Sequence, residues 1–235
     1  MRHLFLILTC LTLMPSFAQD ELPKVSVDTT FFSKPDSLYR EDQFYIGVTY
    51  NRLLSSPRAF RQNGFSSGIS AGFLRDMPIN KNRTYALALG AGLSYVNYQQ
   101  NLVISQSNGD YQYQTVSESD LSKGKIEQIF IDVPLEFRWR NSTPTSYKFW
   151  RIYTGFKLQY LIYSRSKYVG ENIDYSVSNN KDFNRFQYGP YLAVGFNTWN
   201  FQAFYGLNSI FKGASVNNES IQMKSLNIGL MFYIL

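Results

Sequence analysis

The strongest constraint on this chain is a strict two-residue alternation between larger side chains and small ones. It is clearest between Thr84 and Tyr98, where the two sets occupy alternate positions. The larger set is Tyr85, Leu87, Leu89, Ala91, Leu93 and Tyr95, and the smaller set is Ala86, Ala88, Gly90, Gly92 and Ser94. Side chains of a β-strand point alternately to its two faces, so the pattern predicts strands with one apolar face and one small-residue face.

The same alternation divides the chain into eight predicted strands separated by polar turn segments. They span Gln43–Asn51, Gly64–Arg75, Thr84–Tyr98, Ile126–Trp139, Phe149–Tyr163, Arg185–Asn197, Trp199–Asn208 and Met223–Leu235. After Met14 no uninterrupted apolar stretch reaches the roughly 18 residues of a transmembrane helix, so crossing a bilayer would need a closed barrel. We therefore expect an all-β fold in which residues 43–235 form an eight-stranded antiparallel transmembrane β-barrel of the outer membrane.

Residues 1–18 have the anatomy of a secretory signal peptide. Arg2 and His3 precede an apolar run from Leu4 to Met14, and Ser16-Phe17-Ala18 supplies small residues before a cleavage site. Cys10 offers a lipoprotein alternative, although the segment before it is too short to span a membrane.

Residues 19–42 form the next predicted segment. They are polar and contain Pro23 and Pro35, which is typical of a flexible leader, here expected in the periplasm. The alternative is a docking segment for a periplasmic partner, with Phe31 and Phe32 as its anchors.

Cleavage after Ala18 would remove Cys10 and His3, the only cysteine and the only histidine in the chain. The mature protein could then build neither a His-based nucleophile nor a His- or Cys-based zinc site. Losing Arg2 would lower the formal charge from +6 to +5, and the charges are dispersed rather than arranged in the basic stripe that nucleic acid needs. We expect no catalytic residues, no cofactor, no metal and no small-molecule substrate.

Connection lengths provide a separate indication of a membrane barrel. The longer connections are Arg52–Asn63, Gln99–Lys125, Ser164–Asn184 and Ser209–Gln222, and the shorter ones are Asp76–Arg83, Arg140–Lys148 and the turn at Thr198. Outer-membrane barrels have short periplasmic turns and longer external loops. A soluble β-sandwich is the alternative, but it gives no reason for this alternation.

The tryptophans follow the same division of the barrel into two ends. Trp139, Trp150 and Trp199 each stand beside a short connection, in the outward row of their strands, and are predicted to form a periplasmic-side aromatic girdle. The expected girdle at the opposite end is Tyr50, Tyr95, Tyr160 and Tyr188. Core aromatics of a soluble β-protein would show no such segregation.

The fourth and fifth predicted strands carry charges on the row opposite their apolar residues. Asp132 and Glu136 in one strand, and Arg151 and Lys157 in the next, share the inward parity. Folded as a hairpin about Thr143-Pro144, these strands would bring Asp132 near Lys157 and Glu136 near Arg151 as a lumen salt-bridge cluster. Solvated charges of a soluble sandwich are one alternative. A paired-carboxylate acid/base site is another, disfavoured because side chains normally fill an eight-stranded interior.

Two prolines conflict with regular strand pairing. Pro134 and Pro190 fall within predicted strands, where proline cannot donate to the hydrogen-bond ladder. A closed barrel has no free edge to accommodate them, so we expect local bulges at both.

The central hairpin also resembles a known family. The runs IDVPLEFRWR (Ile131–Arg140) and YKFWRIY (Tyr147–Tyr153) are similar to the PorT family of Bacteroidota outer-membrane proteins. The resemblance implies a part in the type IX secretion system, which exports proteins with a C-terminal sorting signal and, in gliding species, motility adhesins. It also implies other secretion components as partners beside outer-membrane lipid. It supplies no catalytic motif, and the C-terminal Phe232–Leu235 lacks the terminal aromatic residue familiar in proteobacterial barrels.

Two functional classes therefore remain open. The first is a component of a secretion machine, and the second is a stand-alone barrel that binds or anchors through its external loops. A solute channel ranks third, because eight strands leave little interior beyond side chains.

Overall fold

The computed structural model describes residues 42–107, 109–117, 123–141, 149–170, 174–217 and 219–234. The predicted signal peptide, nearly all of the predicted leader and the Thr143-Pro144 turn lie outside these ranges. No helix in the described ranges is long and apolar enough to span a membrane.

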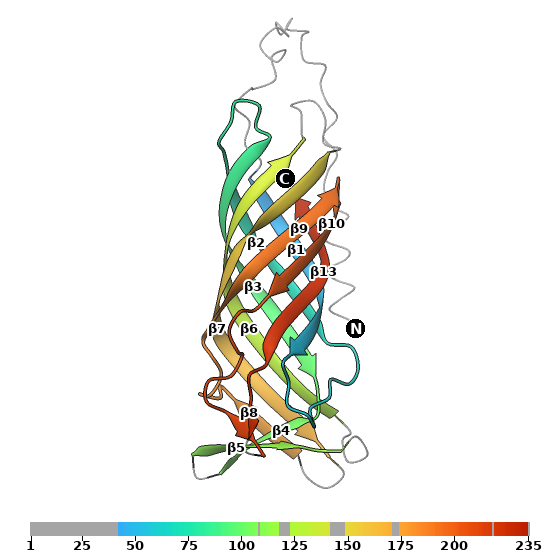
Figure 1. The fold of residues 1–235 in the computed structure, drawn as a ribbon, viewed down its shortest axis with the longest axis vertical. Coiled ribbons are helices and arrows are strands. Elements are labelled where there is room, and N and C mark those ends of the chain that lie inside the picture. The colour runs from blue at the N-terminus through green and yellow to red at the C-terminus, as the bar shows by residue number, and fades with distance from the viewer. Residues whose placement is uncertain are drawn as a thin grey trace, which may run out of the picture. The chain divides into compact units, whose positions relative to one another are not determined.

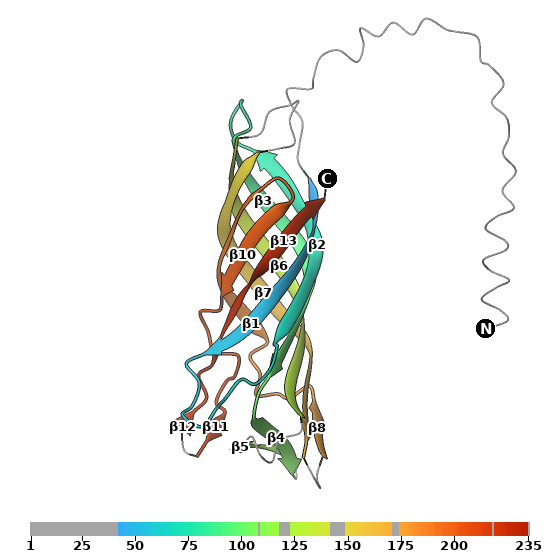
Figure 2. The same cartoon turned by 90° about the vertical axis from the view of Figure 1, so that its right-hand side faces the viewer.

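Eight strands close into one antiparallel barrel. They are β1 (Gln43–Leu54), β2 (Ser67–Pro78), β3 (Tyr85–Gln99), β6 (Lys123–Arg140), β7 (Trp150–Val169), β9 (Phe186–Phe196), β10 (Trp199–Tyr205) and β13 (Lys224–Ile234). They pair in the order β6-β3-β2-β1-β13-β10-β9-β7, and pairing of β6 with β7 completes the ring. Figures 1 and 2 show the closed wall from two sides. The prediction of an eight-stranded antiparallel barrel is confirmed.

The two faces of the wall differ as the alternation predicts. In β3 the side chains of Leu87, Leu89 and Leu93 are 41%, 49% and 55% exposed, whereas Ala86 and Ala88 are 1% and 0% exposed. Every barrel strand has large apolar residues among its exposed positions. Such an outward apolar surface suits hydrocarbon, which cannot hydrogen-bond to polar groups.

Large side chains fill the lumen. The interior cluster contains Tyr45, Leu74, Ala88, Tyr153, Tyr191, Ala193, Phe204, Met231 and Tyr233. Two lumen cavities that both touch Lys157 have volumes of about 10 and 20 Å³. A cavity of that size holds about one water molecule, so the described lumen is packed rather than open.

The longer connections fold into a cap at one end of the barrel, which we call the loop end. They contain β4 (Leu102–Ser107), β5 (Asp110–Thr115), β8 (Asp174–Ser178), β11 (Ser215–Val216) and β12 (Glu219–Ser220), none of which was predicted. These strands lie together in Figure 2. The opposite end, with the turns at 79–84 and 197–198, is the turn end.

A second hydrophobic core holds the cap onto the barrel. Its members are Leu53, Phe60, Val96, Tyr98, Leu102, Ile104, Ile126, Phe130, Leu161, Phe183, Ile210, Phe211, Ala214, Val216, Ile221 and Met223. Tyr113 packs against this core and donates a 2.8 Å hydrogen bond to Asp182, while Asn180 donates one of 2.9 Å to its hydroxyl. Burial raises the pKa of Tyr113 far above its usual range, so the hydroxyl keeps the proton that it donates.

The expectation of bulges at Pro134 and Pro190 is wrong. The pairing of β6 with β7 shifts register between Ile129 and Phe130 instead, and it passes through Pro134 without a shift. The pairing of β3 with β6 omits the positions of Pro134 and Val133 and resumes in the same register. The ladder of β9 with β10 ends at Tyr191, next to Pro190. Each proline therefore lies at an interruption of one ladder, where its missing N–H costs no extra distortion.

Candidate functional site

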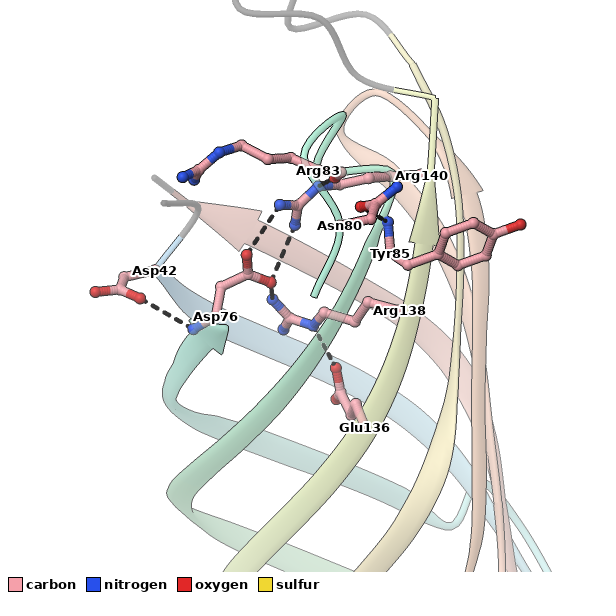
Figure 3. A network of polar contacts seen from close by, with 8 residues as sticks. All are labelled: Asp42, Asp76, Asn80, Arg83, Tyr85, Glu136, Arg138 and Arg140. Carbon is pink, nitrogen blue, oxygen red and sulfur yellow. Dashed lines mark hydrogen bonds and ion pairs between the residues drawn. The ribbon is translucent and has the colours of Figure 1, made fainter. Parts of the chain in front are cut away.

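A buried charge network lies inside the barrel near its turn end. Asp76 accepts a 3.0 Å hydrogen bond from Nη1 of Arg138. It also accepts bonds of 3.0 and 2.9 Å from Nη1 and Nη2 of Arg140. Nε of Arg138 lies 3.0 Å from Glu136. All four side chains are at most 2% exposed, and Figure 3 shows them converging from two strands.

Small residues on the intervening strand make this convergence possible. Asp76 is on β2 and both arginines are on β6, with β3 between them. The register places Ala88 between Asp76 and Glu136, and Ala86 opposite Arg138. A larger inward side chain at either alanine would occupy the space through which the guanidinium reaches Asp76. The small residues on the inward face of β3 therefore leave room for ion pairs between β2 and β6.

The predicted contact between Glu136 and Arg151 is not formed. In the β6–β7 register Glu136 faces Gly155, and Arg151 faces Arg140. Residues at i and i+2 of one strand share a face, so Arg138 lies closer to Glu136 than Arg151 does. Arg138 therefore forms the ion pair with Glu136 that was predicted for Arg151. The Arg151 guanidinium instead lies over the Phe149 ring, 4.5 Å from its centroid, which is a cation–π arrangement.

A second polar network lies farther along the lumen. Lys157 approaches Asp132 to 3.9 Å, in the diagonal position that the hairpin register allows. Asp132 also accepts hydrogen bonds from Gln159 at 2.8 Å and from Ser94 at 3.0 Å. The Lys157 ammonium lies 4.4 Å from the centroid of the Phe204 ring. Of the four charges of the predicted cluster, Asp132 and Lys157 thus lie in this network and Glu136 lies in the first. Arg151 contacts the Phe149 ring instead.

Replacing Lys157 with Met should destabilise the barrel by about 1–3 kcal/mol, because the buried Asp132 carboxyl would lose the cation that it faces. Combining Lys157→Met with Asp132→Asn should recover part of the loss. A double-mutant cycle of denaturant unfolding in detergent measures this coupling. Lys212→Met, at an exposed cap position, serves as the control. Strictly additive effects would show that the 3.9 Å pair contributes no coupling.

The three tryptophans lie at the turn end of the wall. Trp150 and Trp199 are 54% and 61% exposed, and both pair with Phe196. Trp139 is partly exposed and pairs with Tyr85, at the start of β3. A band of outward aromatics at one end suits the membrane interface, and its place on the periplasmic side stays a prediction.

Cysteine labelling of intact cells tests this orientation. Gln112→Cys and Ser178→Cys, both at exposed cap positions, should react with a membrane-impermeant maleimide. Thr198→Cys at the turn end should react only after the outer membrane is permeabilised, because short turns face the periplasm. Labelling of Thr198→Cys in intact cells would reverse the orientation.

The two networks are suited to holding strands together rather than to catalysis. Each buried carboxylate lies next to a cation: Asp76 next to Arg138 and Arg140, Glu136 next to Arg138, and Asp132 next to Lys157. In the described ranges, no group of three or more His, Cys, Asp or Glu residues could hold a metal ion. Paired and hydrogen-bonded buried charges tie three strands to one register.

Comparison with known proteins agrees with this architecture. The family model described as outer membrane protein beta-barrel domain matches residues 17–212, which is most of the chain. The chain belongs to this family of outer-membrane β-barrels. It is an outer-membrane protein, as the alternating strands and the connection lengths predict.

A solved structure and the curated proteins complete the comparison. The structure of Ail, the attachment invasion locus protein of Yersinia pestis, matches 83% of this chain and 100% of its own. Its sequence identity is 12% and its TM-score is 0.33. A search of curated proteins finds no similar sequence.

Proposed function

We propose that this outer-membrane barrel is a non-enzymatic component of the type IX secretion system, acting in protein secretion or gliding. The observation that carries the proposal is the filled lumen, because a barrel with water-sized internal cavities acts through its surfaces. The type IX secretion system is proposed because Ile131–Arg140 and Tyr147–Tyr153 resemble the PorT family. Its partners would be other secretion components and membrane lipid, with no nucleic acid and no small-molecule substrate.

The folded cap favours a second candidate. Five short strands and a hydrophobic core give the loop end a defined surface rather than a set of independent loops. Such a surface suits a stand-alone barrel that binds or anchors through its external side.

A clean deletion separates the two candidates. If the protein is a secretion component, deletion should abolish export of proteins that carry the C-terminal sorting signal, and the wild-type gene should restore it. Replacement of residues 106–112, at the end of the β4–β5 hairpin, by a Gly-Ser linker provides the second arm. Normal export in the deletion strain would refute the secretion role. A surface-binding defect in both the deletion strain and the linker variant, with normal export in both, would support the second candidate.

The protein should conduct no measurable current in a planar lipid bilayer. Residues such as Tyr153, Tyr191 and Tyr233 occupy the lumen, and hydrated ions cannot pass cavities the size of one water molecule. Single-channel recording at moderate salt measures this, with a known porin as the positive control. Stable porin-sized steps would contradict the packed lumen and favour a channel.

A further inference from the structure

A hollow opens in the barrel wall where β7 changes its neighbour. The β7–β9 ladder ends at the pair Tyr160–Phe186, and the β7–β8 ladder begins at Arg165–Ser178. Between these pairs, Leu161 and Ser164 form hydrogen bonds to residues 185 and 179 of the connection rather than to a strand. The resulting hollow has a volume of about 330 Å³, within the range of small-ligand sites.

The membrane-facing side of the hollow is apolar. The register shift in the β6–β7 pairing leaves Ile162 without a partner, so Ile162 and Tyr163 are both exposed although they are consecutive. This is the two-against-one arrangement of a β-bulge. Tyr160, also in the lining, packs on the Phe186 ring with centroids 5.0 Å apart. These side chains continue the lipid-facing surface into the hollow.

The cap side of the hollow is cationic. Lys181 and Arg185 are both exposed and both line it. In the described part of the chain neither side chain has an ion-pair partner. The nearby carboxylate of Asp182 is already engaged, because it accepts the hydrogen bond from Tyr113.

A second hollow at the loop end is a weaker candidate. It has a volume of about 420 Å³ and includes Tyr50, Arg52 and Arg61. The Arg61 guanidinium, however, already donates to the carbonyls of Arg58 and Phe60. Its lining is also more polar, which fits a lipid less well than the hollow beside β7.

We propose that the hollow beside β7 binds the phosphorylated sugar headgroup of an outer-leaflet glycolipid, with Lys181 and Arg185 on the phosphate. The apolar wall faces the bilayer and the two cations lie toward the cap, which matches a molecule with acyl chains on one side and anionic phosphate on the other. Cationic side chains bind phosphate through short charge-assisted hydrogen bonds. The assignment assumes that the loop end faces outward, and it is independent of any role in secretion.

Native mass spectrometry of the purified, detergent-solubilised protein tests the site, with diphosphoryl lipid A as the probe. The wild-type protein should retain one lipid A in preference to phosphatidylglycerol. Lys181→Gln combined with Arg185→Gln should weaken binding about tenfold or more, the equivalent of about 1.4 kcal/mol. Arg58→Gln combined with Lys212→Gln removes the same charge from exposed cap positions outside the hollow and should bind as the wild type does.

Heat-modifiable gel mobility verifies that each variant is folded. If the double variant fails to assemble, lipid A binding is measured in the single variants Lys181→Gln and Arg185→Gln instead. Unchanged binding in these variants would overturn the proposal. Equal weakening by both double variants would reduce the effect to general charge attraction, and so would overturn it. Displacement of lipid A by millimolar inorganic phosphate, or equal retention of phosphatidylglycerol, would show that the hollow binds anions without specificity for a glycolipid. Either result would overturn the proposal.

Discussion

Asp76→Asn should destabilise the barrel by about 3–5 kcal/mol, because it removes one partner of a buried charge network. Asp76 accepts three hydrogen bonds from two guanidinium groups, and its side chain and both arginine side chains are fully buried. The asparagine would keep an acceptor oxygen but lose the negative charge, and its amide would face the Arg140 cation. Urea unfolding in detergent, followed by tryptophan fluorescence, measures the loss.

The neighbouring residue on β2 provides the control. Arg75 pairs with Asp42 across 2.7 Å, but its side chain is 51% exposed, so Arg75→Gln should cost about 0–1 kcal/mol. Adding Arg140→Met to Asp76→Asn should restore part of the lost stability, since the guanidinium that loses the Asp76 carboxylate in the single variant would be gone. A cost below about 1 kcal/mol for Asp76→Asn would show that water reaches the network and screens it.

Side-chain parity was predictable from sequence because it is a local property. Strand residues alternate faces with a period of two, so one bulky row in β3 fixes the orientation of every residue in that strand. Leu89 and Ala88 lie on the predicted faces, and so do Val133 and Asp132 in β6. Connection lengths then predicted which strand ends lie together.

The partners of the lumen charges were only partly predictable. The sequence suggests a hairpin register, but Asp76 reaches Arg138 across β3, between strands that are not adjacent in the sheet. Asp76 was also assigned to a turn, although β2 continues to Pro78. Arg138 and Arg140 lie two and four residues after Glu136, so they share its inward face. This spacing could have shown from the sequence that the inward face of β6 is rich in cations.

The cap strands were missed for a different reason. β4 and β5 belong to a hairpin outside the barrel wall, so lipid imposes no apolar row on them. The burial pattern of β5 alternates only between exposed and intermediate positions. The extension of β7 from Tyr163 to Val169 was missed likewise, because β7 pairs there with β8 of the cap. Periodicity therefore detects the strands that lipid constrains and misses those stabilised by the cap core.

Close backbone approach is a second constraint on the wall, and Gly155 is the position where it can be tested most directly. A Cβ built on Gly155 would lie 1.9 Å from the carbonyl oxygen of Leu135 and 2.8 Å from Cα of Glu136. Both contacts are with backbone, so no side-chain rotation relieves them. Glycine within a strand marks such a close approach of two chains.

Gly155→Val should therefore prevent stable closure between β6 and β7, where closed-ring geometry gives neither strand room to move outward. Gly155→Ala should cost about 1–3 kcal/mol, the range expected for overpacking a tight site. Refolding into detergent, read from heat-modifiable gel mobility, separates closed barrels from open chains. Ala91→Val adds comparable bulk at an exposed, outward position of β3 and should refold normally, because the added methyl groups face detergent or lipid. Normal closure of Gly155→Val would mean that β6 and β7 can separate locally at Leu135, and that the barrel wall tolerates a side chain at this close approach.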